Sequence, residues 1–368
     1  MSGPLPSFAA DARAFLRPGP RLADELECAL SVVLAILFAH LIGARTVSWA
    51  AFTGFVVMRG RVGDSMVRGL LRIVGTIAGA GLALLVAPLV LERPVALALV
   101  AGLVATGSLY GAMTGKRAYA WLLAGLTFEM ILFDAFTHPG LDLDGFARTR
   151  LLEVLAGTAA CLLVSIVSAI TLRRLWPAAP APRAARLGWH PHALRHAAQG
   201  GVAVMLLPAL WLAVRAPALS QSCITIMAVM LVPVTTLGAS GFAPVSRRLV
   251  LRVAGCVAGA VLAAAVLLLA HGSPPLLIAA TCLGVIVGRH IENGGSTFAY
   301  VGTQFVLAVL VVLVPDSYDA VEIGPALERL AGILIGMALL EPVLLAWHLI
   351  GPRLPGVTTA PAGAGDGE

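Results

Sequence analysis

The sequence predicts an all-α polytopic membrane protein with about 12 transmembrane helices, arranged as two parallel six-helix repeats. Three observations predict it. Of the 368 residues, 59% are hydrophobic and only 12% are charged, and the mean hydropathy is +0.94, whereas soluble domains carry roughly twice that charge. Apolar stretches recur along almost the whole chain at about the length that a helix needs to cross a bilayer. Segments of the first half of the sequence also return in the second half.

The apolar stretches are separated by short loops rich in Arg, Gly, Pro or Asp. We expect the membrane helices to start near Glu27, Val47, Arg68, Arg93, Ala118, Leu151, Ala193, Gln221, Arg247, Pro274, Thr297 and Ala326. The second stretch, from Val47 to Met58, is too short for a full span, so it could borrow flanking residues, tilt little or be broken. We expect the segment GRHIENGGS, which begins at Gly288, to be a loop between helices.

Internal repetition is the most informative pattern in the chain. The segment LRIVGTIAGA with Arg72, Gly75 and Gly79 returns as LRVAGCVAGA, and two further correspondences are weaker. In the first correspondence, Arg72, Gly75 and Gly79 match Arg252, Gly255 and Gly259. In the second, Arg150 and Gly157 match Arg329 and Gly336. In the third, Tyr119 and Trp121 match Phe298 and Tyr300. Six helices per half is an even number, so both halves insert in the same direction and the repeats are parallel.

Basic residues fall in alternate loops, which predicts that both termini face the cytoplasm. We divide the chain into a cytoplasmic segment 1–26, a first repeat 27–172, a basic Pro/Ala-rich linker 173–192, a second repeat 193–350 and a flexible cytoplasmic tail 351–368. The net charge of +6 is then a signal of topology, and nucleic-acid binding is a poor explanation for it.

The sequence shows no chemistry of an enzyme. Its five cysteines form no CxxC pair, and no phosphate-binding loop, HExxH motif or Ser-His-Asp set is visible. We expect no metal, no cofactor and no ATP hydrolysis within this chain. The proton gradient or the membrane potential would then drive active transport.

Several short motifs occur in a fixed order in the first half. They are Trp49-Ala50-Ala51-Phe52-Thr53, the run from Arg72 through Thr76 to Gly79, Tyr119-Ala120-Trp121, and Arg150 with Gly157. In this order they resemble the fusaric acid resistance protein-like (FUSC) or aromatic acid exporter family. The resemblance implies an inner-membrane efflux permease for small amphipathic carboxylates, with a periplasmic adaptor protein as a partner in some relatives. The linker of about 20 residues is too short to bury a core, unlike the large cytoplasmic domain of many members.

Arginines are the main candidates for binding or lining a pore. Arg72 and Arg252 lie about one turn into the third expected helix of each half, where they could attract carboxylates or anchor to lipid phosphate. Arg150 and Arg329 form an equivalent pair expected at the other membrane face, where local pairing with Glu153 and Glu328 is the alternative.

Other polar residues of the apolar stretches are also candidates. Glu129 lies in the middle of such a stretch, where a carboxylate suits proton coupling or bonds a neighbouring helix. Thr303 and Gln304 could bind an acid or tie helices together, and Trp49 could stack on an aromatic ring or anchor at the interface.

Glycines spaced four apart are expected to pack helices closely. They are Gly75 with Gly79, Gly255 with Gly259, and Gly332 with Gly336.

The expected function is therefore an inner-membrane efflux transporter for small organic, aromatic carboxylic acids. A passive organic-anion channel formed by a dimer is the first alternative, since the family also resembles the plant malate channels. A non-transporting membrane scaffold or lipid-handling protein is the second. The lipid bilayer, a small organic acid, an envelope adaptor and a second copy of the chain are the expected partners.

Overall fold

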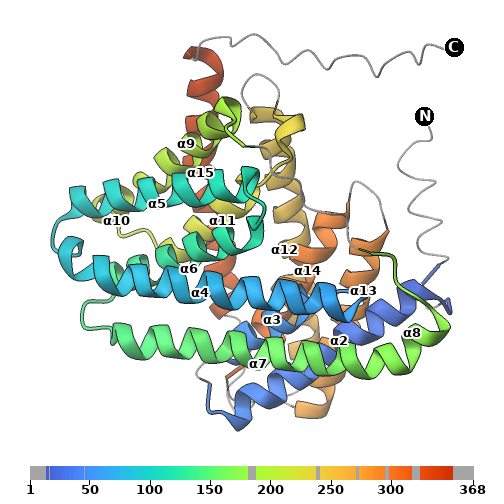
Figure 1. Ribbon diagram of the computed structural model, residues 1–368. Helices are drawn as coiled ribbons and strands as arrows, with labels where there is room; N and C mark the ends of the chain where they lie inside the picture. Colours follow the sequence, from blue (N-terminus) through green and yellow to red (C-terminus); the bar gives the residue numbers. More distant parts are fainter. Residues whose placement is uncertain are drawn as a thin grey trace, which may run out of the picture.

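The computed structural model describes eight stretches of the chain. The described residues are 14–15, 17–44, 46–180, 188–237, 241–270, 273–294, 298–316 and 324–350. They form helices joined by short turns, and no β-strand occurs among them (Figure 1). Residues 1–13 of the predicted N-terminal segment, residues 181–187 of the linker and the whole predicted tail 351–368 lie outside the described residues.

Each half of the chain contributes a similar series of helices. In the N-terminal half they are α2 (Pro20–Leu41), α3 (Val47–Val57), α4 (Val62–Val90), α5 (Pro94–Thr114), α6 (Ala118–Thr137), α7 (Leu143–Ile170) and the short α8 (Leu172–Leu175). In the C-terminal half they are α9 (Pro191–Met205), α10 (Leu207–Val214), α11 (Leu219–Met230), the 3-10 turn η1 (Val234–Thr236), α12 (Phe242–Ala270), α13 (Pro274–Asn293), α14 (Ala299–Leu313) and α15 (Gly324–Ile350).

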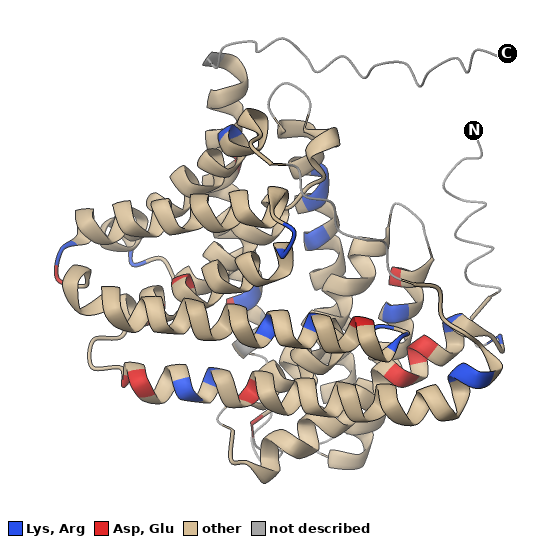
Figure 2. Cartoon of the chain, in the orientation of Figure 1, with Lys and Arg blue, Asp and Glu red and all other residues tan. Residues whose placement is uncertain are grey.

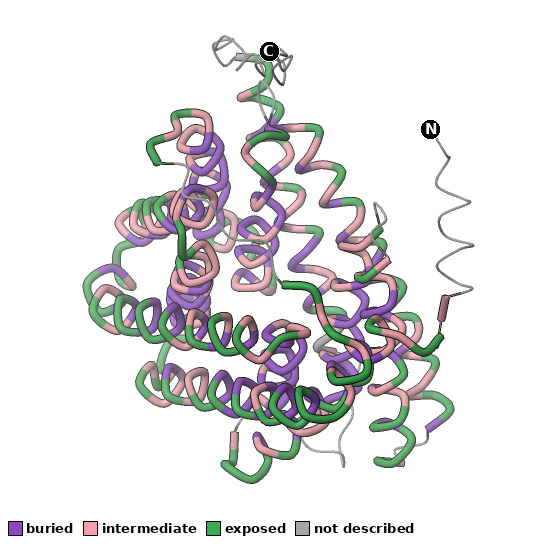
Figure 3. Tube along the Cα trace, turned by 45° about the vertical axis from the view of Figure 1, so that its right-hand side comes forward, coloured by how far each residue is buried: buried purple, intermediate pink, exposed green. Residues whose placement is uncertain are grey.

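Eight helical segments among the described residues are long and apolar enough to cross a membrane. The helices α3, α11 and α14 are apolar but shorter. Along α4 the exposed side chains Leu70, Val74 and Ile77 share one helix face, and Figure 3 shows exposed residues along one side of the peripheral helices. Such outward apolar faces are what lipid covers in a membrane protein.

Helix starts agree with the prediction where a polar or proline residue marks them. The helices α3, α6 and α13 begin at Val47, Ala118 and Pro274 as expected. In contrast, α4 begins at Val62 and α12 at Phe242, before the expected arginines. Because the first turns of α4 and α12 contain polar residues, a search for continuous apolar runs does not find them.

Two predictions are therefore wrong. Arg72 lies about three turns into α4, and not one turn, so it is too deep to be an anchor at the helix end. The segment from Gly288 to Asn293, predicted as a loop, forms the last turns of α13. Its charged residues are bound by another helix, which sequence reasoning did not foresee.

Side chains from other segments bind the backbone at both ends of the short helix α3. At its start, the Glu153 carboxylate accepts from the Thr46 amide at 3.1 Å and Asp316 accepts from the Val47 amide at 2.8 Å. At its end, the Val56 carbonyl accepts from Arg68 at 2.9 Å. Acids at the N-terminus and a cation at the C-terminus match the helix dipole and satisfy free backbone groups.

Asp316 lies in the turn after α14. Burial raises the pKa of its carboxyl, and the hydrogen bond from the Val47 amide opposes this. The N-terminus of α3 is thus bound by a residue from the other half of the chain.

The two halves are interwoven and not stacked as separate units. Within the halves, α4 packs on α6 and α12 on α14, while α5 packs against α9 and α13 against α2 across the halves. Both large apolar clusters contain residues of both halves, such as Phe133 with Met227 in one and Phe55 with Phe305 in the other. Charged residues are sparse along most helices and gather where α2, α8 and α13 meet (Figure 2).

Candidate functional site

A cavity of about 540 Å³ lies between helices of both halves. It is lined from α3, α4, α6 and α7 of the N-terminal half and from α11, α12, α14 and α15 of the C-terminal half. Its charged lining consists of one acid, Glu153, and six arginines, namely Arg68, Arg72, Arg150, Arg248, Arg252 and Arg329. The cavity therefore carries a strong excess of positive charge.

All seven residues predicted as binding or pore candidates line this cavity. They are Arg72, Arg252, Arg150, Arg329, Trp49, Thr303 and Gln304. Arg150 and Arg329, predicted at the membrane face opposite to Arg72, line the same cavity as Arg72 and Arg252. Each of the four guanidinium groups is removed from water, with at most 13% of the side chain exposed.

Arg72 is held by neutral hydroxyl groups. Its Nε donates to the Thr53 hydroxyl at 3.1 Å and its Nη1 to the Tyr119 hydroxyl at 2.8 Å. In the C-terminal half, Arg252 Nη1 donates to Gln304 Oε1 at 2.9 Å and to the Tyr300 hydroxyl at 3.3 Å. Both arginines are therefore bound within the protein, and neither reaches lipid phosphate.

Arg68 and Arg248 form a third pair that sequence reasoning assigned only to membrane topology. The Arg68 guanidinium lies 4.1 Å from the centre of the Tyr119 ring, and that of Arg248 lies 4.3 Å from the Tyr300 ring. Each tyrosine thus contacts two arginines of the neighbouring helix. A spacing of four residues, which places Arg68 and Arg72 on one helix face, could have revealed the pair.

The contacts also correct the predicted register between the halves. Tyr119 corresponds to Tyr300 by its contacts, and not to Phe298. A side chain at Gly79 would meet Thr127, and one at Gly259 would meet Ala308. Thr127 is therefore the counterpart of Ala308, and Glu129 corresponds to Leu310.

Arg150 and Trp49 lie together on one wall. Arg150 Nη1 forms an ion pair with Glu153 at 3.0 Å, as the local alternative predicted, and its guanidinium lies 4.6 Å from the Trp49 ring. Within the described part of the chain, Arg329 forms no ion pair with Glu328, which is exposed. The two arginines therefore differ in their surroundings although they line the same space.

Glu129 is buried beside the cavity but does not line it. Its side chain is 1% exposed, and neither carboxylate oxygen has a hydrogen-bond partner among the described residues. The next residues on α6, Met130 and Ile131, do reach the cavity. A buried carboxylate without a partner is costly, so it is a candidate for a group that holds a proton.

Two family models match this chain. The fusaric acid resistance protein family matches residues 26–181, and a model described as fusaric acid resistance protein-like matches residues 234–340. The chain belongs to the fusaric acid resistance protein family. This confirms the resemblance seen in the motifs. The matches and the apolar helices together make it a multi-pass membrane protein.

Several relatives of the chain are named as subunits of an efflux pump. A p-hydroxybenzoic acid efflux pump subunit AaeB from Musicola paradisiaca (strain Ech703) is 28% identical over 159 residues, which are 40% of this chain and 24% of that protein. The AaeB of Salmonella arizonae is 28% identical over 158 residues, with the same shares. The aligned part thus spans about a quarter of these relatives. No solved structure matches the chain.

Glycines of the chain let the backbones of neighbouring helices approach closely around the cavity. A Cβ at Gly75 would lie 2.6 Å from the Ala120 carbonyl oxygen, and one at Gly255 would lie 2.6 Å from that of Val301. The other predicted glycines also approach a neighbouring helix closely. Gly79 of α4 faces α6, Gly259 of α12 faces α14, and Gly332 and Gly336 of α15 face α11. These contacts fix how the helices carrying the arginines lie against those carrying the tyrosines.

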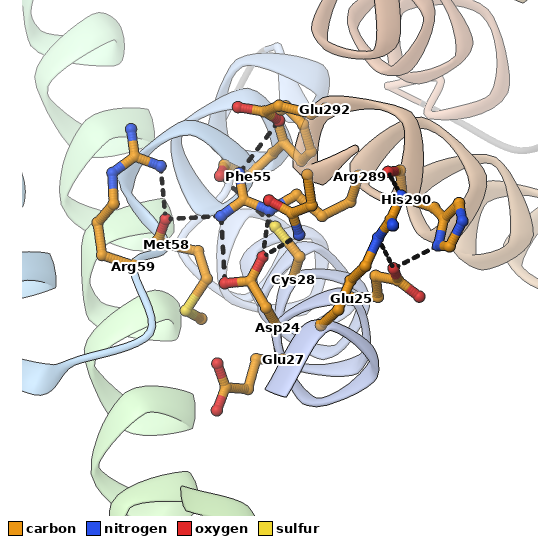
Figure 4. A network of polar contacts seen from close by, with 12 residues as sticks. Asp24, Glu25, Glu27, Cys28, Phe55, Met58, Arg59, Arg289, His290 and Glu292 are labelled. Carbon is orange, nitrogen blue, oxygen red and sulfur yellow. Dashed lines mark hydrogen bonds and ion pairs between the residues drawn. The ribbon is translucent and has the colours of Figure 1, made fainter. Parts of the chain in front are cut away.

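A network of charged residues joins the halves near the end of α3 (Figure 4). Arg289 of α13 binds the Asp24 carboxylate of α2 with both Nε, at 2.6 Å, and Nη2, at 3.2 Å. Beside it, His290 Nδ1 lies 2.7 Å from Glu25, and Arg173 binds Glu27 at 2.6 Å. Arg289 also donates to the Met58 carbonyl at 3.4 Å. The network therefore links α2, α13, α8 and the end of α3.

Proposed function

We propose that the chain is an inner-membrane efflux transporter for small aromatic carboxylic acids. The observation that carries the proposal is the cavity, in which six arginines face one acid, and Arg72, Arg252 and Arg329 are buried. Buried cations without compensating charge attract anions, because burial in low dielectric strengthens the attraction. Among the lining residues Trp49, Phe52, Tyr119 and Tyr300 offer aromatic surface to a ring. The names of the AaeB relatives support the same substrate class.

The proposal includes an arrangement in the membrane. Twelve helices cross the bilayer as two parallel six-helix repeats, 27–172 and 193–350, joined by the linker 173–192, with both termini in the cytoplasm. Support comes from contacts that recur in both halves, such as Arg72 with Tyr119 and Arg252 with Tyr300. The cavity then lies between the repeats, where carriers of this type place their substrates.

The driving force is the proton gradient or the membrane potential. Glu129, buried and without a hydrogen-bond partner among the described residues, is the proposed proton carrier. A periplasmic adaptor protein and a second copy of the chain are proposed partners, and the chain is a transporter and not an enzyme.

Reconstitution in liposomes tests this function. We expect the protein to move labelled p-hydroxybenzoate in response to an imposed pH gradient or potential. The double variant Arg72→Gln with Arg252→Gln should abolish the flux at equal protein content. Arg93→Gln is the matched control, because Arg93 is exposed in the turn between α4 and α5 and does not line the cavity.

The same experiment separates the alternatives. Flux that follows the potential with no movement of protons identifies a passive anion channel. Wild-type liposomes that move none of a panel of aromatic and aliphatic acids would refute the transporter and favour the scaffold.

A further inference from the structure

The two halves of the cavity treat their arginines differently. In the N-terminal half, Arg150 is paired with the Glu153 carboxylate at 3.0 Å. Arg72 has two short hydrogen bonds, to Thr53 at 3.1 Å and to Tyr119 at 2.8 Å. On this side the Glu153 carboxylate compensates one positive charge, although the Arg150 Nε is also buried without a hydrogen-bond partner among the described residues.

The C-terminal half lacks this compensation. Three residues after Arg150 stands Glu153, but three residues after Arg329 stands Gly332. Arg329 is 6% exposed, and its Nε is buried without a hydrogen-bond partner. Within the described residues its contacts are the Phe52 ring, 5.9 Å away, and the Cys256 thiol, a weak acceptor.

Arg252 is in a similar environment to Arg329. Its acceptors, Gln304 and Tyr300, are uncharged like those of Arg72, and its Nε is also buried without a partner among the described residues. Arg252 and Arg329 line the same cavity, so their like charges share one space. Two buried like charges with free N–H groups are unfavourable unless an anion lies between them, and a carboxylate can accept from both.

We propose that Arg252 and Arg329 together hold the carboxylate of the bound anion, whereas Arg72 and Arg150 shape the opposite wall. This inference rests on the proposed function and gives it a specific subsite. The two halves, although similar in sequence, then have different roles: the C-terminal half binds the charged group, and the N-terminal half determines the space left for the rest of the molecule.

Binding measurements on purified full-length protein test the subsite. We would measure the Kd of p-hydroxybenzoate by calorimetry for Arg252→Gln, Arg329→Gln and the matched variants Arg72→Gln and Arg150→Gln. Loss of Arg252 or Arg329 should weaken binding about tenfold or more, as expected for a lost charge-assisted hydrogen bond. The two N-terminal variants should change Kd by less than about threefold. Equal effects in all four, or larger effects of Arg72→Gln and Arg150→Gln, would overturn the proposal.

A second variant covers the case in which Arg329→Gln does not fold. Glu153→Gln leaves both C-terminal arginines intact and removes the acid that competes for Arg150. If Arg252 and Arg329 hold the carboxylate, Kd should change by less than about threefold. If Arg150 holds it, binding should tighten by about tenfold once Glu153 no longer competes.

The outcomes distinguish the subsite from the function. Wild-type protein that binds no carboxylate at all would refute the proposed function. Wild-type protein that binds p-hydroxybenzoate but loses affinity equally in both halves would refute only the asymmetric subsite. Arg329→Lys keeps the charge and should retain part of the affinity, which a purely structural role of Arg329 does not predict.

Discussion

The Nη1 atom of Arg72 donates to the Tyr119 hydroxyl at 2.8 Å across the contact between α4 and α6. One turn before it on α4, the Arg68 guanidinium lies 4.1 Å from the centre of the same ring. Arg252, Arg248 and Tyr300 repeat the arrangement, with a longer hydrogen bond of 3.3 Å. Each tyrosine therefore satisfies one cation with its hydroxyl and another with its ring.

Replacing the Tyr119 hydroxyl should destabilise the fold. Tyr119→Phe removes the shorter bond from Arg72 but keeps the ring under Arg68, and should lower the free energy of unfolding by about 1.5–3 kcal/mol. Tyr300→Phe should cost less, because Arg252 keeps its bond to Gln304 at 2.9 Å. Thermal unfolding in detergent measures both, and a larger loss for Tyr300→Phe would contradict the prediction.

Two glycines on one helix provide a matched pair. At Gly79 a methyl group would collide with the Ala124 carbonyl oxygen of α6, whereas nothing lies within 4 Å of one at Gly81. Gly79→Ala should destabilise the protein by about 1–3 kcal/mol. Gly81→Ala should be neutral or stabilise it by up to about 1 kcal/mol, because alanine favours the helix. Similar unfolding temperatures for the two variants would show that α4 and α6 do not approach so closely.

Replacing Glu129 should stabilise the fold and abolish proton-driven transport. Glu129→Met removes a buried carboxylate without a hydrogen-bond partner among the described residues and should raise the unfolding temperature. The same change should abolish transport driven by a pH gradient in liposomes. The control is Glu153→Gln, which breaks the ion pair with Arg150 and should lower the unfolding temperature. A Glu129→Met variant that is less stable, or that still couples to protons, would remove Glu129 from the mechanism.

The contact between α2 and α13 should depend on one ion pair. Asp24→Asn leaves the buried Arg289 without its bidentate partner, and breaking such a pair costs about 3–5 kcal/mol. Asp144→Asn is the control, because Asp144 is exposed in the first turn of α7 and its loss costs at most about 1 kcal/mol. Unfolding temperatures of the two variants should differ clearly, and equal values would show that the pair adds nothing.

Local signals in the sequence predicted an all-helical membrane protein and two of the three arginine pairs that line the cavity. Hydropathy fixed most helix starts, and the repeated LR-x-x-G segment led directly to Arg72 and Arg252, which the cavity brings together. Arg68 and Arg248 were missed because a basic residue near a helix start looks like a topological signal. Only the fold shows that each lies on a tyrosine ring.

Interactions between distant segments could not be predicted in the same way. Asp24 and Arg289 are far apart in the chain, and the segment around Arg289 contains glycines that suggested a loop. The register between Tyr119 and Tyr300 was also two residues off, because the aromatic residues of both segments can be aligned in more than one way. The packing of glycines against backbone carbonyls decides between these alignments.

The network in Figure 4 sets an order for biosynthesis. Asp24 and Glu25 leave the ribosome about 265 residues before their partners Arg289 and His290. Until then, Asp24 and Glu25 lack the partners that offset the free-energy cost of burying their carboxylates. The N-terminal helices therefore cannot reach their final packing by themselves, and a nascent chain that stops before α13 is left as a substrate for membrane quality control.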